Sequence, residues 1–278
     1  MRAPRVIRSA VRPKRLSRWT AAVPLALALA VGAAACGAAP TPAGPGSGSA
    51  PPAAGARTLT VFAAASLTGA FTELGRTFEA AHPGTTVRFN FGSSATLAQQ
   101  IVQGAPADVF AAASPATMKT VTDASLAGEP AVFARNKLQI AVPAGNPAGI
   151  DELKDLADAR VKVALCAAQV PCGAAAVKAL DAAGLTVTPV TLEQDVKATL
   201  TKAALGEVDA ALVYATDVLA SGGKVRGIAF PEADEAINDY PVAALSGAPA
   251  GDLARRFVDL VLSQRGGDVL TRAGFEAP

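Results

Sequence analysis

Hydrophobic and polar residues alternate in short blocks along most of the chain, and these blocks predict strands and helices in regular succession. Runs rich in apolar and β-branched residues predict strands at 59–62, 86–91, 108–112, 137–142, 161–165, 185–190, 210–214, 225–230 and 240–245. Apolar residues at helical spacing predict helices at 67–81, 95–103, 115–124, 151–156, 174–183, 195–204, 215–220 and 249–263. This alternation is typical of α/β folds, in which helices cover a mainly parallel sheet. We expect two such lobes, with a ligand-binding cleft between them where the strands end.

The N-terminal segment differs in composition from the rest of the chain. A basic stretch without acidic residues precedes an apolar run from Ala21 to Ala35, which is followed by Cys36. This order is typical of a secretory signal over residues 1–35. The segment also resembles a bacterial lipoprotein signal, which implies that Cys36 is lipidated and anchors the exported protein to the outer face of the cytoplasmic membrane. Plain secretion with a free Cys36 is the alternative.

Residues 36–57 have the composition of a linker. After Cys36 they are almost entirely Pro, Gly, Ala, Ser and Thr, without a large apolar residue that could contribute to a core. We therefore expect a flexible tether between the membrane and a folded body at residues 58–278, which is long enough for a sizeable core.

The net charge of the chain changes sign when the expected signal is left out. Residues 1–35 contain seven of the 25 basic residues and none of the 23 acidic ones, so the remainder has a net charge of about −5. Nucleic-acid binding would require a basic stripe on the folded body, and this composition argues against it.

Two further cysteines, Cys166 and Cys172, lie close together in the segment CAAQVPC. In an exported protein such a pair predicts a disulfide. A redox-active pair or a metal site is the alternative, but five intervening residues match neither a C-x-x-C motif nor the common zinc spacings. We expect no metal site and no cofactor.

Three segments place hydroxyl groups where a predicted strand ends and a helix begins. They are VFAAASLT with Ser66, FGSSATL with Ser94, and ALVYATD with Tyr214. The ordinary interpretation is a helix cap for each serine and a half-buried ring for the tyrosine. Together, however, hydroxyls and free N–H groups at helix starts are suited to binding an anion. None of the three segments contains Arg or Lys, which favours a fully deprotonated oxyanion held by neutral donors.

The sequence also resembles a known family, the molybdate-binding periplasmic proteins of ABC transporters. The segments VFAAASLT, FGSSATLAQQI, GAPADVF, QVPCG, EQDVKATL and ALVYATDV match that family in the same order. The resemblance implies an oxyanion site made by the hydroxyl groups of Ser66, Ser94 and Tyr214 and by the backbone N–H groups of Cys172 and Val196. The ligand it implies is molybdate or tungstate, which are nearly equal in size and identical in charge, and the metal is only that of the oxyanion.

The resemblance implies a two-lobed periplasmic binding protein fold of the second class. Its first lobe would contain residues 58–137 and 240–278, and its second lobe residues 138–239. Two crossing segments would act as hinges for closure around the anion. The protein would act as a monomer and deliver its ligand to the permease of an ABC transporter.

Two other functions remain open on the residues alone. An enzyme with a Ser-His-Asp triad would have to use His82, the single histidine, and no common hydrolase, metalloprotease or nucleotide-binding motif is present. A binding protein for sulfate or phosphate is the closer alternative. Phosphate sites often use a carboxylate to accept the proton of the ligand, whereas sulfate differs from molybdate mainly in size.

Overall fold

The computed structural model describes residues 57–278, which form two five-stranded sheets, each with its own hydrophobic core. The expected signal, Cys36 and all of the expected linker except Arg57 lie outside the described residues. We call the first sheet with its helices the first lobe, and the second sheet with its helices the second lobe. The predicted two-lobed α/β fold is confirmed.

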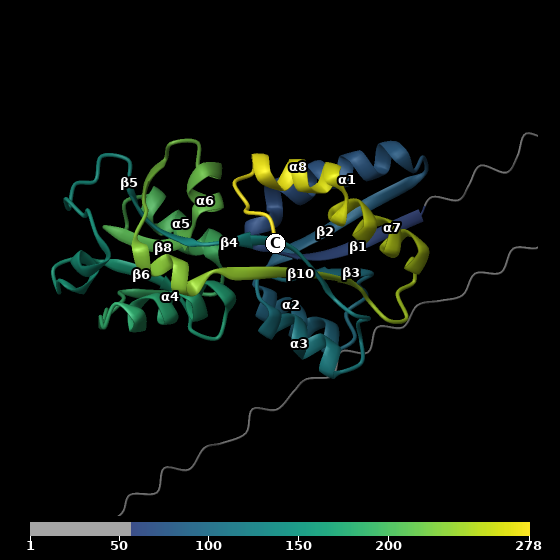
Figure 1. Cartoon of the computed structure of the whole chain (residues 1–278), viewed down its shortest axis with the longest axis horizontal. Coiled ribbons are helices and arrows are strands. Elements are labelled where there is room, and N and C mark those ends of the chain that lie inside the picture. Colours follow the sequence, from purple (N-terminus) through teal and green to yellow (C-terminus); the bar gives the residue numbers. More distant parts are fainter. Residues whose placement is uncertain (1–56) are drawn as a thin grey trace, which may run out of the picture. The chain divides into compact units, whose positions relative to one another are not determined.

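The first sheet has the strand order β2-β1-β3-β10-β4. Its strands are β1 (Arg57–Ala64), β2 (Thr85–Gly92), β3 (Val109–Ala111), β4 (Ala131–Asn136) and β10 (Asn238–Ala244). Its helices are the 3-10 turn η1 (Ala65–Leu67), α1 (Thr68–Ala81), α2 (Ser94–Val102), α3 (Pro115–Asp123), α7 (Gly251–Leu262) and α8 (Gln264–Arg272). Figure 1 shows α1 and α8 on one side of this sheet and α2 and α3 on the other.

The second sheet has the strand order β7-β6-β8-β5-β9. Its strands are β5 (Leu138–Pro143), β6 (Val163–Cys166), β7 (Thr191–Glu193), β8 (Ala210–Tyr214) and β9 (Val225–Ile228). Its helices are α4 (Pro171–Ala182), α5 (Val196–Ala204), α6 (Ala215–Ala220) and the 3-10 helices η2 (Leu153–Ala157) and η3 (Pro231–Ala236). The chain enters this lobe at Lys137, between β4 and β5, and leaves it just before β10.

Both sheets contain parallel and antiparallel strand pairs, and one strand in each sheet accounts for all of its antiparallel pairs. The β1–β2, β1–β3, β6–β7 and β6–β8 pairs are parallel. Every antiparallel pair contains β5 or β10, the strands that begin directly after the chain changes lobe. The parallel strands therefore carry the βαβ units, and their carboxyl ends are where the loops of a binding site are expected.

Aromatic rings dominate the core between the first sheet and α1, α7 and α8. Phe257 of α7 packs edge-on against Phe71 and Phe78 of α1, with ring centroids 5.9 and 5.4 Å apart. All three rings are almost completely buried, and such edge-to-face pairs stabilise a core beyond the area they bury. This packing fixes α1 on the sheet and, with it, the η1 turn that precedes the helix.

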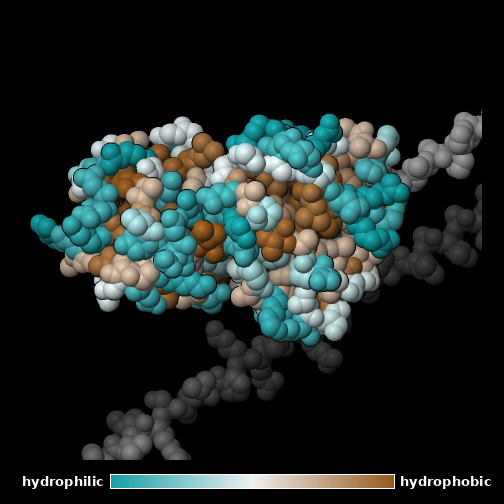
Figure 2. All heavy atoms as spheres, viewed as in Figure 1, coloured by the Kyte–Doolittle hydropathy of each residue, from teal (hydrophilic) through white to brown (hydrophobic). Residues whose placement is uncertain are grey.

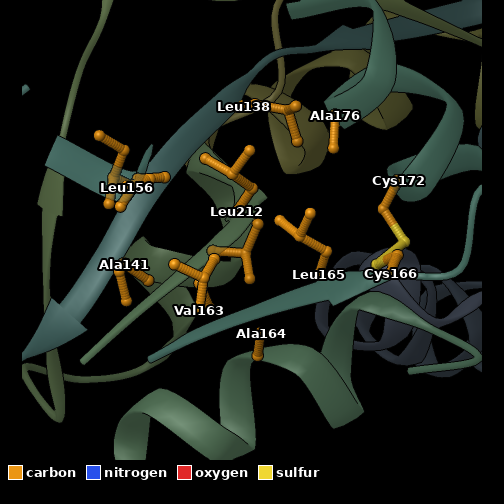
Figure 3. Close-up of a cluster of buried hydrophobic side chains, with 14 of the residues drawn as sticks. Leu138, Ala141, Leu156, Val163, Ala164, Leu165, Cys166, Cys172, Ala176 and Leu212 are labelled. Carbon is orange, nitrogen blue, oxygen red and sulfur yellow. A yellow bond between two sulfur atoms is a disulfide. The ribbon is translucent and has the colours of Figure 1, made fainter. Parts of the chain in front are cut away.

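The core of the second lobe is built from smaller aliphatic side chains on both faces of its sheet. Figure 3 shows Val163 and Leu165 of β6 with Leu138 and Leu212, while Ala164 points to the opposite face. This alternation is the period of two expected for a strand covered on both faces. The Cys166–Cys172 disulfide lies at one end of this core (Figure 3).

The surface carries scattered rather than continuous hydrophobic residues. Figure 2 shows brown residues in separate groups between hydrophilic ones on the face in view. Single exposed apolar side chains of this kind are ordinary in folded proteins. Within residues 57–278, the helices are too short or too polar for any of them to cross a bilayer.

The predicted elements differ from the structure in several places. The strand expected at 185–190 is absent there, and the nearby edge strand β7 begins only at Thr191, after Pro189, which lacks an N–H for sheet pairing. The segment expected as a helix at 151–156 is the 3-10 helix η2. Strand β4 and helix α8 carry no prediction, and both pack on the first lobe.

Candidate functional site: a pocket between the two lobes

A small pocket lies between the lobes, where the loops after several strands meet. Its cavity volume is about 20 Å³, far below the ~300–1,000 Å³ of pockets for larger organic ligands. The lining residues are Ala64, Ala65, Ser66, Gly92, Ser93, Ser94 and Ala113 from the first lobe, and Val170, Pro171, Cys172, Gln194, Asp195, Val196 and Tyr214 from the second. All five residues expected at the oxyanion site line this one pocket.

The serines of the pocket do not cap helices in the ordinary way. Ser93 is the N-cap residue of α2, but its side chain makes no capping hydrogen bond, and neither does any side chain at the start of η1. By contrast, Ser114 accepts from the Thr117 N–H at the start of α3, and Ser263 caps α8 in the same way. The pocket serines are therefore available for another partner, and the capping interpretation fails for them.

Ser66 and Ser94 are both buried and both have a partner behind the pocket. The Ser66 hydroxyl lies 3.0 Å from the hydroxyl of Tyr240, in β10. The Ser94 hydroxyl accepts a hydrogen bond of 3.0 Å from the N–H of Ala113. Each hydroxyl is thus held from one side by the first lobe, while its residue lines the pocket.

Ser93 is a pocket residue that the sequence interpretation missed. Its hydroxyl is buried, and the hydrogen bonds of residues 57–278 leave it without a partner. A buried unpaired hydroxyl costs free energy, so a hydroxyl in this position beside a pocket is suited to bind a polar ligand. The sequence places Ser93 directly before Ser94 in FGSSATL, so it could have been a candidate, but the family resemblance implies a role for Ser94 only.

The start of α4 presents Cys172 to the pocket and is fixed by two constraints. The disulfide to Cys166 joins the end of β6 to the first turn of α4, with the two Cα atoms 5.7 Å apart. Next to it, Gly173 packs so closely that a Cβ atom would lie 1.9 Å from the carbonyl oxygen of Ala167. The first N–H groups of a helix have no partner within the helix, so this turn directs free donors toward the pocket.

The start of α5 is arranged in a similar way around Asp195. This carboxylate accepts hydrogen bonds from the N–H groups of Lys197 (2.8 Å) and Ala198 (3.0 Å). It is therefore occupied as the N-cap of its own helix. Among the described residues, no acceptor is found for the N–H of Val196, which lines the pocket. Val196 is therefore a free backbone donor at a helix start.

Tyr214 closes the pocket at the end of β8, and its phenol is completely buried. Its hydroxyl accepts a hydrogen bond of 2.7 Å from Nδ2 of Asn238, at the start of β10. Burial raises the pKa of Tyr214 well above its ordinary value, with further contributions from Tyr240 and Asp217. The phenol thus stays protonated at neutral pH and remains a donor.

Charge is nearly absent from the pocket wall. Among the described residues that line it, there is no Lys or Arg, and the single acid is Asp195. Lys197, which follows Val196 in α5, has its Nζ 2.9 Å from Oδ1 of the buried Asp217 and is not part of the pocket lining. Desolvation raises the pKa of Asp217, although Lys197 opposes that shift. A ligand in the pocket would meet hydroxyl and N–H dipoles rather than a counter-charge.

His82 does not contribute to the pocket. Its imidazole stacks on Phe78 with ring centroids 4.1 Å apart, and its Nδ1 lies 2.9 Å from the carbonyl oxygen of Phe78 at the end of α1. No group of three or more His, Cys, Asp and Glu residues suited to a metal ion occurs within residues 57–278. The described residues thus offer this pocket neither a histidine base nor a metal cluster.

Two α/β lobes with a small donor-lined pocket between them define a solute-binding protein. The family described as bacterial extracellular solute-binding proteins matches residues 59–276, and the chain belongs to this family. It is 44% identical over 230 residues to the molybdate-binding protein ModA of Mycobacterium tuberculosis, covering 82% of this chain and 88% of that relative.

Two further comparisons extend this result. The chain is 32% identical to a putative ABC transporter substrate-binding lipoprotein, YvgL of Bacillus subtilis, over 79% of this chain and 86% of that protein. The solved structure of the periplasmic molybdate-binding protein of Azotobacter vinelandii is similar with a TM-score of 0.69 and 22% identity, over 79% of this chain and 99% of that one. This last likeness establishes the fold.

Proposed function

We propose that the protein captures molybdate in the pocket between its lobes and delivers it to the permease of an ABC transporter. The observation that carries the proposal is the convergence of Ser66, Ser94, Cys172, Val196 and Tyr214 on one pocket without Lys or Arg. The ModA and YvgL relatives, named for molybdate binding and for an ABC transporter, support the ligand and the partner. Both are binding proteins, and the proposal involves no catalysis.

The proposed ligand set uses three hydroxyls and a ring of backbone donors. Ser66, Ser94 and Tyr214 would donate through their side chains, and Cys172 and Val196 through their N–H groups. We add the hydroxyl of Ser93, because it is buried and unpaired at the same wall. A hydrogen bond to a charged group contributes about 1.5–3 kcal/mol. Six such bonds leave a margin for tight binding after the cost of immobilising the anion.

The N-termini of three helices would stabilise the negative charge of the bound anion. The first turns of α2, α4 and α5 line the pocket, and each helix terminus has a partial positive charge. This charge is fixed in place by folding and needs no counter-ion from the protein. A dianion would therefore be stabilised in a pocket from which cationic side chains are absent.

The same donor set predicts how well the pocket binds oxyanions other than molybdate. Tungstate has the same charge and nearly the same size as molybdate, and we expect the pocket to accept both. Sulfate is smaller, so it would leave some of the fixed donors without a partner. Hydrogen phosphate carries a proton that needs an acceptor, and Asp195, the one acid lining the pocket, already accepts two helix N–H groups through Oδ1.

Calorimetric titration of residues 51–278, which form one compact unit, tests the proposal directly. We expect strong heats with molybdate and tungstate and weak ones with sulfate and phosphate. The double substitution Ser66→Ala, Ser94→Ala should abolish binding, whereas Ser114→Ala, which removes an N-cap outside the pocket, should not. A folded, ligand-free sample that binds none of the four anions would refute the proposed function. Calorimetry is preferable to fluorescence because Trp19, the single tryptophan, lies in the expected signal.

We further propose that residues 58–137 with 240–278 and residues 138–239 move as two bodies around the anion. The support is that the chain changes sheet only near Lys137 and again just before Asn238. Closure would bring the hydroxyl groups of the first lobe and the N–H groups of the second onto one ligand. Small-angle scattering with and without molybdate tests this, and identical profiles would contradict it.

For localisation, we propose export and lipid anchoring through Cys36 at the outer face of the cytoplasmic membrane. The relative YvgL, described as a lipoprotein, supports this assignment. After expression of the full chain in a bacterial host, the protein should fractionate with membranes and incorporate a labelled fatty acid, and Cys36→Ser should abolish both. Unchanged membrane association of Cys36→Ser would exclude the anchor.

A further inference from the structure

A carboxylate stands at the wall of the proposed anion pocket. Of the described residues that line the pocket, Asp195 is the one acid, and it lies directly before the first residue of α5. Its Oδ1 accepts hydrogen bonds from the N–H groups of Lys197 (2.8 Å) and Ala198 (3.0 Å), while neither bond uses Oδ2. A negative charge is therefore present in a lining that otherwise consists of neutral groups.

This charge has no paired cation in the described part of the chain. Asp195 takes part in none of the ion pairs of residues 57–278. Lys197, two residues further on, pairs with Asp217 instead. Burial is the main cause of the raised pKa of Asp217, and the charge of Asp195 adds to that shift. The carboxylate thus acts on its surroundings as a charge that no side chain neutralises.

The three helix starts at the pocket differ in charge for this reason. Helix α2 begins after Ser93 and α4 after Val170, and neither has an acidic residue in its first turn. Helix α5 begins after Asp195, whose charge is attracted by the partial positive charge of the helix terminus. A bound anion would be attracted by the same terminus, so the carboxylate opposes what α5 contributes to anion binding.

The peptide bond keeps the carboxylate close to any anion at Val196. The N–H of Val196, a proposed donor to the ligand, is attached directly to the carbonyl carbon of Asp195. With a hydrogen bond of ordinary length, the nearest ligand oxygen lies within roughly 7 Å of the carboxylate. Two like charges at this distance repel each other strongly near a protein surface, and a dianion is repelled about twice as strongly as a monoanion.

We propose that Asp195 is an affinity-limiting residue, whose charge repels the bound dianion and makes the ligand easier to release. This inference rests on the proposed oxyanion-binding function. The cap of α5 does not itself require a charge, because Asn and Ser cap helices about as well as Asp does. The carboxylate therefore provides something that a neutral cap would lack, which is a faster dissociation of the anion from a site rich in donors.

Neutral caps at position 195 separate the charge from the capping hydrogen bonds. Asp195→Asn and Asp195→Ser keep a side-chain oxygen for the first N–H groups of α5 and remove the charge. We expect both variants to bind molybdate at least about tenfold more tightly than the wild-type protein. Asp195→Glu keeps the charge on a longer side chain, so it should not gain affinity.

Competition calorimetry with molybdate measures the dissociation constants, and circular dichroism verifies that each variant is folded. Asp181→Asn is the matched control, because it removes one negative charge from an exposed position of α4 in the same lobe. Asp181 is not part of the pocket lining, so this variant should bind molybdate as the wild-type protein does.

Two results would overturn the proposal while leaving the proposed function intact. The first is molybdate binding that is unchanged or weaker in both neutral variants, since the carboxylate would then be neutral or helpful to the site. The second is an equal gain in Asp181→Asn, which would assign the effect to the overall charge of the lobe. The absence of molybdate binding by the wild-type protein would instead refute the proposed function itself.

Discussion

Lys197 Nζ lies 2.9 Å from Oδ1 of Asp217, and this ion pair joins the first turn of α5 to the first turn of α6. The Asp217 carboxylate is completely inaccessible, whereas about a third of the Lys197 side chain is exposed. Apart from Lys197, the described residues give the carboxylate no well-directed hydrogen bond. Among the described residues, Lys197 is the one cation that pairs with this carboxylate, so the ion pair ties α5, which contains Val196 of the pocket, to α6.

Loss of this partner should destabilise the protein in a pH-dependent way. Lys197→Met leaves the buried carboxylate uncompensated, so the free energy of unfolding should fall by roughly 3 kcal/mol at about pH 8. The pKa of Asp217 is already raised in the folded protein, and the substitution raises it further. The penalty grows as pH rises above the unfolded value of about 3.9, so the loss should be smaller at about pH 5.

Urea denaturation at the two pH values measures this effect. Lys178→Met, on the exposed face of α4, is the matched control and should change stability little at either pH. A loss for Lys197→Met that is equal at both values would show that Asp217 is not the group involved.

Two glycine-to-alanine substitutions should have opposite effects. In Gly173→Ala the new Cβ would lie 1.9 Å from the backbone oxygen of Ala167, so the start of α4 must move. We expect a loss of several kcal/mol in stability and weaker molybdate binding. In Gly69→Ala the Cβ meets open space within α1, so stability should rise by about 0.5–1 kcal/mol with binding unchanged. Thermal unfolding and calorimetry distinguish the two, and tolerance of Gly173→Ala would contradict the packing at α4.

Removal of the disulfide should weaken both stability and binding. Cys166→Ser with Cys172→Ser opens a small loop, for which the chain-entropy estimate is about 2 kcal/mol. Because the bridge holds the first turn of α4 against β6, we also expect a lower affinity for molybdate. The comparison of oxidised and reduced wild-type protein by calorimetry gives the same test without mutation. Equal affinities would show that α4 is fixed by packing alone.

Ser93→Ala should raise the stability of the ligand-free protein and lower its affinity for molybdate. Its hydroxyl is buried without a partner, so its removal should stabilise the ligand-free protein by about 1 kcal/mol. If the hydroxyl binds the anion, molybdate affinity should fall at the same time. Ser114→Ala, which removes an N-cap, should do the reverse and cost about 1 kcal/mol without affecting binding. A Ser93→Ala variant with unchanged affinity would remove Ser93 from the ligand set.

Much of the fold could be predicted because local pattern and tertiary packing agree. The β1–α1–β2–α2 succession follows the apolar periodicity closely, since each of these strands ends in small residues before a helix. The helix expected at 249–263 ends at Leu262 in the structure, but α8 begins directly after it, at a serine cap that the sequence interpretation did not use. Strand β4 was missed because it is an edge strand whose burial does not alternate regularly and whose last two residues, Arg135 and Asn136, are polar.

The side-chain part of the candidate site was accessible from sequence for a similar reason. Ser66 and Ser94 each follow a predicted strand and Tyr214 ends one, so their meeting in the cleft between the two lobes could be expected. Cys172 and Val196 came only from the resemblance, because a backbone N–H leaves no signature in residue type. The contact between Tyr240 and Ser66 was not predictable at all, since these residues lie more than 100 positions apart.

The first turns of α4 and α5 have an evolutionary consequence. A donor that belongs to the peptide bond survives almost any substitution except proline, provided that the helix still starts at the same place. Mutation can therefore change the side chain at Val196 freely while the chemistry offered to a ligand persists, and the same holds at Cys172 where packing alone keeps the first turn of α4 in place. Selection at these positions acts on backbone geometry, through neighbours such as Gly173 and Asp195. Searches that compare side chains at the contact positions will underestimate how many distant proteins share this site.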